Sequence, residues 1–212
     1  MTRLVFVLGR ESELSIAEIA AVIEPYHPDW KTALVRHEAL IVSCAKEIDI
    51  AALMRKLGGT IKMAVCVDED SFLAHTDIPR ESNDRGIPSA EQFAQFILQH
   101  ITGDGKMCFG FSVHDLGGGM KAVLRERKNM LRTGPMVKRL LREVGRSARW
   151  VTSREATLSS VVVVKNKLLS PDGVEFLVLV APDRIILART LAVQPFEEWG
   201  NRDYGRPARN ME

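Results

Sequence analysis

The first 68 residues alternate between short apolar runs and runs with helical spacing. Strand-like runs cover 4–8, 32–35, 39–43 and 60–67. An amphipathic run follows Ser15, with Glu18 three residues on, as in a helix-opening capping box. Asp49 precedes a second run with helical spacing, which Gly58 and Gly59 end. The order βαββαβ predicts a ferredoxin-like domain over residues 1–70.

Residues 71–88 lack this periodicity and are rich in Asp, Asn, Gly and Pro. Such a composition predicts a linker or a long loop. The alternative is that residues 71–88 form an ordered extension of the first domain.

The second half again mixes both periodicities. A helical run over 89–101 precedes an alternating strand over 106–114, and three further strands are predicted near 160–165, 174–180 and 184–190. Between them, a basic helical stretch follows three glycines at 117–119. Thr133-Gly134-Pro135 predicts a division of that stretch into two helices. The expected class is therefore α+β, built of α/β layers, with a second domain over 89–193 and a polar tail over 194–212.

Composition excludes a disordered, collagen-like or fibrous chain and a membrane-spanning protein. Hydrophobic residues make up 46% of the 212 residues and charged residues 26%, as in globular proteins. The longest stretch without Asp, Glu, Lys or Arg is 12 residues, too short for a bilayer span. We expect no membrane contact and no secretory signal. Three widely spaced cysteines indicate no disulfide framework and no metal site, which favours a cytoplasmic location.

Charge is strongly segregated along the chain. The net charge is only +2, but residues 121–155 hold 11 basic and three acidic side chains. This local excess is typical of a surface that binds a polyanion. The expected RNA-binding residues are Lys121, Arg125, Lys128, Arg132, Lys138, Arg139, Arg142, Arg146 and Arg149. A solvated helix face is the structural alternative.

Residues 117–119 could present backbone N–H groups to a phosphate, although a plain loop is the favoured interpretation. The sequence contains no motif for a catalytic nucleophile or an acid–base pair, and no residues with metal-ligand spacing. We therefore expect a binding module that is not an enzyme on its own.

Three stretches resemble the THUMP-containing tRNA guanosine methyltransferases. They are Leu8-Gly-Arg-Glu-Ser-Glu-Leu-Ser-Ile-Ala-Glu-Ile19, Leu57-Gly-Gly-Thr-Ile-Lys-Met63, and Ala192-Val-Gln-Pro-Phe196 with Arg202-Asp-Tyr-Gly-Arg-Pro-Ala-Arg-Asn210. The resemblance covers most of the chain but only the amino-terminal half of the family. It implies a ferredoxin-like domain followed by a THUMP domain that together grip tRNA near its acceptor end.

The chain departs from that family in two respects. Asn210 stands where the family commonly has aspartate, and neither the glycine-rich loop for S-adenosylmethionine nor the Asn/Asp-Pro-Pro-Tyr/Phe tetrapeptide occurs. We therefore expect no cofactor in this chain. S-adenosylmethionine would belong to a methyltransferase domain lost by truncation or supplied as a separate subunit.

These observations predict a tRNA-binding module that presents RNA to a methyltransferase domain. The alternative is a protein-interaction module whose tail docks on a partner enzyme. A stand-alone enzyme is the least favoured interpretation. The tail residues expected to dock on a partner or domain are Trp199, Arg202, Asp203, Tyr204, Arg206 and Pro207.

Overall fold

The computed structural model describes residues 2–25, 27–36, 38–45, 47–67 and 87–196. The tail residues expected to dock on a partner, from Trp199 to Pro207, lie outside this part of the chain, as does nearly all of the linker expected over 71–88. Among the described residues, no helix is both long and apolar enough to cross a membrane.

The first half of the chain has the predicted ferredoxin-like layout. Its strands pair antiparallel in the order β2-β3-β1-β4. Its elements are β1 (Thr2–Leu8), α1 (Ser12–Ile23), β2 (Lys31–Arg36), β3 (Ala39–Cys44), α2 (Ile50–Lys56) and β4 (Thr60–Cys66).

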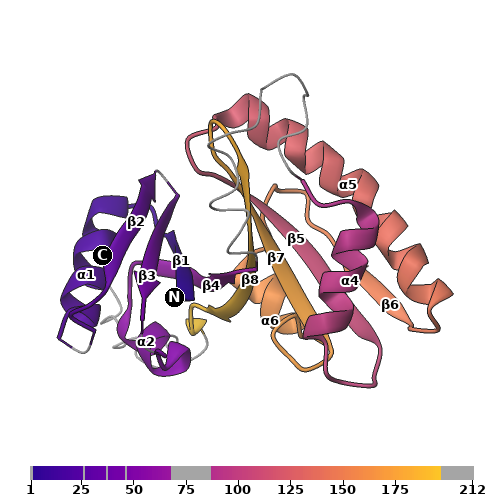
Figure 1. Ribbon diagram of the computed structural model, residues 1–212, viewed down its shortest axis with the longest axis horizontal. Helices are drawn as coiled ribbons and strands as arrows, with labels where there is room; N and C mark the ends of the chain where they lie inside the picture. The colour runs from indigo at the N-terminus through magenta and orange to yellow at the C-terminus, as the bar shows by residue number, and fades with distance from the viewer. Residues whose placement is uncertain (1, 26, 37, 46, 68–86, 197–212) are drawn as a thin grey trace, which may run out of the picture.

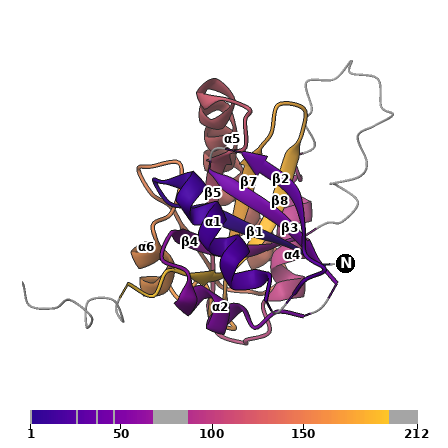
Figure 2. The same ribbon diagram turned by 90° about the vertical axis from the view of Figure 1, so that its left-hand side faces the viewer.

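The second half adds four strands to the same sheet. Strand β5 runs parallel to β6 and β7, and β8 returns antiparallel between β7 and β4. Its elements are α4 (Ala90–His100), β5 (Met107–Asp115), α5 (Met120–Glu143), β6 (Ala148–Val151), α6 (Ser160–Lys165), β7 (Gly173–Val180) and β8 (Ile185–Val193). One eight-stranded sheet results, in the order β2-β3-β1-β4-β8-β7-β5-β6, and the α+β class is confirmed (Figures 1 and 2). The division into two domains stays a prediction.

Four apolar clusters hold the layers together, the smallest of them around α6. One packs α1 and α2 on the β1–β4 half, and a second packs α4 and α5 on the β5–β8 half. The third cluster lies on the sheet faces that α1, α2, α4 and α5 do not cover. It contains Val7 and Ile41 from the first half and Leu177 and Leu179 from the second half. The two halves of the sheet therefore face each other, with α1 and α2 on one outer side, α4 and α5 on the other, and α6 on the inner side of the second half (Figure 1).

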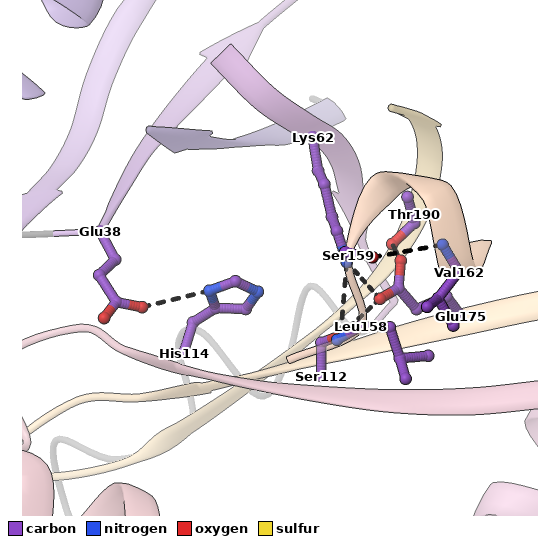
Figure 3. Close-up of polar contacts among 9 residues, drawn as sticks. All are labelled: Glu38, Lys62, Ser112, His114, Leu158, Ser159, Val162, Glu175 and Thr190. Carbon is purple, nitrogen blue, oxygen red and sulfur yellow. Dashed lines mark hydrogen bonds and ion pairs between the residues drawn. The ribbon is translucent and has the colours of Figure 1, made fainter. Parts of the chain in front are cut away.

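A buried ion pair crosses the sheet beside this third cluster. Lys62 on β4 binds Glu175 on β7, and both side chains are at most 1% exposed. Ser112 donates to Glu175 Oε1 at 2.5 Å and Thr190 to Oε2 at 2.8 Å, while the Leu158 N–H donates to Ser112 Oγ at 2.8 Å (Figure 3). Burial lowers the pKa of Lys62, and the Glu175 carboxylate opposes that shift. The network thus joins strands from both halves of the chain.

A second polar contact joins the β2–β3 turn to the end of β5. Glu38 Oε2 lies 3.2 Å from His114 Nδ1 and accepts the Asp115 N–H at 3.2 Å (Figure 3). The pKa of Glu38 lies below its ordinary value of 4.5, chiefly because of the hydrogen bond with His114.

Two elements differ from the sequence-based expectation. The strand predicted at 160–165 is wrong, because these residues form helix α6. The β-prone valines were misleading: Ser159 caps the helix by accepting the Val162 N–H, and Val163 is buried at 0% exposure. Strand β6 had no counterpart among the predicted strands.

The predicted division of the basic stretch at residues 133–135 is also wrong. Helix α5 continues for 24 residues with Pro135 inside it. A proline in a helix interior costs about 3 kcal/mol. Met130, Val137 and Leu141 are buried on both sides of the proline, so packing of one continuous face outweighs that cost.

The capping box predicted at Ser15 is likewise not observed. Helix α1 begins earlier, at Ser12, and the Ser15 hydroxyl donates to the carbonyl oxygens of Glu11 and Gly59. Glu18 accepts the backbone N–H groups of Gly58 and Gly59. Both side chains therefore tie α1 to the loop before β4.

We expect Lys62→Met to lower the free energy of unfolding by about 3–5 kcal/mol, because it leaves the Glu175 carboxylate buried without its charge partner. Adding Glu175→Gln should recover much of that loss. Urea denaturation of the two single variants and the double variant measures the coupling. Strictly additive losses would contradict the pairing.

We expect acid to weaken the contact at Glu38. Because its folded-state pKa is lowered, Glu38 contributes stability above pH 4.5, and that contribution disappears as the pH falls through the folded-state value. Melting temperatures from pH 7 to pH 3 should therefore fall less steeply in Glu38→Gln than in the wild type. Parallel curves for the two proteins would show that the contact contributes nothing.

Candidate nucleic-acid interface

Helix α5 starts at a turn that the end of β5 holds in place. The Asp115 carboxylate accepts the N–H of Gly117 at 2.8 Å and that of Gly119 at 3.0 Å. Gly119 has φ +83°, a backbone conformation that favours glycine. The N–H groups of Gly117 and Gly119 are therefore already bonded, which argues against a phosphate cradle at the glycine run.

The inner face of α5 is apolar and packs on the sheet. Val123, Met130, Val137 and Leu141 belong to the cluster shared with α4 and β5. Gly134 lies so close to the Trp150 ring on β6 that a Cβ there would collide with it. These contacts fix the rotation of α5 about its axis, and hence which side chains face solvent.

The outer face of α5 carries a row of cations. The outer cationic face consists of the exposed residues Lys121, Arg125, Lys128, Arg132, Arg139 and Arg142. Their spacing places them on one side of a helix of 24 residues, which at 1.5 Å per residue is about 36 Å long. The structure therefore brings six of the nine predicted RNA-binding residues onto one helix surface.

The other three predicted residues lie apart from this face. Lys138 is half-buried, and Arg149 is exposed on β6, the edge strand of the sheet. Arg146 donates from Nη2 to the Gly103 carbonyl at 2.5 Å. Arg146 therefore has a structural contact that the sequence did not indicate, and its role in binding RNA stays a prediction.

The cations of the outer face differ in their partners. Arg139 lies 3.5 Å from Glu143 in a solvated pair, and Arg125 binds the buried Glu126. Within the described residues, Lys121, Lys128, Arg132 and Arg142 have no ion-pair partner, so their charge is open to an external anion. The exposed apolar residues Met120, Leu124 and Leu131 lie on the same helix.

A separate apolar groove of about 300 Å³ lies at the end of β8. Met54, Val164, Leu191 and Phe196 are among its lining residues. The groove contains one basic residue, Arg55, and it therefore lacks the cation density of α5. No cluster of three metal-ligating side chains occurs in the part of the chain that the structure describes.

Two of the stretches that carry the family resemblance contact each other. The Gly9 N–H donates to the Gly59 carbonyl at 2.7 Å, and a Cβ on Gly59 would lie 2.5 Å from Ser15 Oγ. With the bonds from Glu18 to Gly58 and Gly59, these residues form a tight junction between α1 and the β4 loop. In this structure they join α1 to the loop before β4.

Comparison with known proteins gives structural likeness only. No protein-family model and no curated protein matches the sequence. A 4-thiouridine synthetase in complex with RNA and bound ATP aligns over 92% of this chain, with a TM-score of 0.43 and 10% identity. A predicted N6-adenine-specific DNA methylase from Listeria monocytogenes str. 4b F2365 aligns over 89%, with a TM-score of 0.40 and 10% identity. The chain spans about two fifths of the length of each of these structures, 42% and 40%.

Proposed function

We propose that this chain is an RNA-binding module that holds tRNA for a methyltransferase domain outside the chain. The observation that carries the proposal is the outer cationic face of α5, with six cations on one helix surface. The sequence resemblance to THUMP-containing tRNA guanosine methyltransferases supports tRNA as the nucleic acid and methylation as the associated reaction.

The mechanism of binding follows from the chemistry of the face. Lysine and arginine contact phosphate oxygens, and these contacts release condensed counterions from the nucleic acid. Such contacts position the backbone of the RNA and do not read its sequence. The module would therefore supply affinity and orientation, while the choice of nucleotide would rest with the methyltransferase domain.

The proposal assigns no catalytic residue and no cofactor to this chain. S-adenosylmethionine would be bound by the methyltransferase domain. The apolar groove at the end of β8 is lined in part by Gln194, Pro195 and Phe196, the first residues of the tail, and a docking role on that domain for residues 194–212 is part of the proposal.

A titration of labelled tRNA against the full chain over a range of salt concentrations tests the proposal. Affinity should fall steeply and linearly on a plot of log K against log salt. Affinity that does not depend on ionic strength would contradict phosphate contacts by α5.

We expect Lys128→Gln with Arg132→Gln to weaken tRNA binding, because neither cation has an ion-pair partner in the described part of the chain. The slope of log K against log salt should decrease in magnitude by about 2, because each substitution leaves one phosphate without its cation. Lys31→Gln with Lys165→Gln is the matched control, since these exposed cations lie on β2 and α6. Equal reductions in affinity in both double variants would show that binding follows total charge and not the face of α5.

A further inference from the structure

A buried carboxylate lies within the helix that carries the outer cationic face. Glu126 is 1% exposed, and Glu126 and Glu175 are the only buried carboxylates among the described residues. The burial of Glu175 is explained by its ion pair with Lys62. Glu126 takes no part in that network, so its burial in a surface helix has another cause.

The Glu126 carboxylate is fully engaged by two neighbours on α5. Oε1 accepts from Arg125 Nε at 2.7 Å and lies 2.6 Å from Arg125 Nη2, so that one edge of the guanidinium is held. Oε2 accepts from Asn129 Nδ2 at 2.7 Å. The Arg125 side chain is still 46% exposed, and part of the guanidinium therefore reaches solvent.

We infer that Glu126 is a positioning residue that holds the Arg125 guanidinium in one orientation for a phosphate group of the RNA. This inference rests on the proposed function. A free arginine or lysine loses side-chain entropy when it binds a phosphate, whereas a guanidinium that is already held loses less. Arginine also presents planar, directional donors that lysine lacks. Arg125 thus contributes through orientation, whereas Lys128 and Arg132 contribute mainly through charge.

If Glu126 positions Arg125, neutralising Glu126 should change RNA affinity in the direction opposite to that expected from net charge alone. Removing a negative charge from a cationic face should strengthen the binding of a polyanion. Removing the group that orients Arg125 should weaken it. Glu143 provides a matched comparison, because it also pairs with an arginine of the same face but is 59% exposed and lies 3.5 Å from Arg139.

The experiment compares Glu126→Gln with Glu143→Gln in the full chain, with labelled tRNA as the probe. We expect Glu126→Gln to weaken binding about 10-fold, as for removal of a charge-assisted hydrogen bond. Glu143→Gln should leave binding unchanged or strengthen it. Glu126→Gln binding as tightly as the wild type, or more tightly, would overturn the inference.

A second variant keeps the test decisive if Glu126→Gln melts below the assay temperature. Arg125→Lys preserves the charge and removes the fixed planar donors, so it should weaken binding several-fold with an unchanged salt slope. Wild-type affinity in Arg125→Lys would overturn the inference. If Lys128→Gln with Arg132→Gln weakens binding while these variants do not, only the positioning role fails; if that double variant also binds normally, the proposed function fails.

Discussion

The ion pair between Lys62 and Glu175 is the constraint on which the arrangement of this chain depends. It connects β4, the last strand of the ferredoxin-like half, with β7 in the other half, across β8. Two charges at this depth are stable only if each is paired and hydrogen-bonded, and Ser112 and Thr190 satisfy the carboxylate. An alternative register between the halves would leave both charges buried without partners. The pair therefore favours one alignment of the eight strands, in addition to the non-directional packing of the aliphatic side chains around it.

That alignment determines what the second half presents to solvent. Helix α5 packs on β5 and β6, with its apolar residues against the sheet and Gly134 against Trp150. Because the helix continues through Pro135, its cations form one row instead of two rows at an angle. For the proposed function, a single continuous row suits the regularly spaced phosphates of an RNA strand better than two divergent rows would. Two separate helices, as expected from the sequence, would have supported the proposed function less well than the continuous helix α5 does.

The spacing of apolar and polar residues predicted most helices and strands correctly. It failed where contacts between residues far apart in the sequence determine the structure. The βαββαβ order followed from alternating and helical spacing alone, and the outer face of α5 from the spacing of its cations. Helix α6 was mistaken for a strand because a run of valines favours strands until a cap and a packing surface are present. Lys62 and Glu175 are 113 residues apart, and neither carries a local signal of its partner. Glu126 resembled any acidic residue in a basic stretch, since only the packing of α5 shows that it is buried.

The central claim is that RNA meets this protein along the outer face of α5, and cross-linking measures this most directly. Labelled tRNA would be cross-linked to the full chain by ultraviolet light, and the modified peptides would be identified by mass spectrometry. We expect modification within residues 121–142, with α1 and α2 on the other half of the sheet left unmodified. Cross-links concentrated on α1, α2 or β2, with α5 unmodified, would contradict the claim.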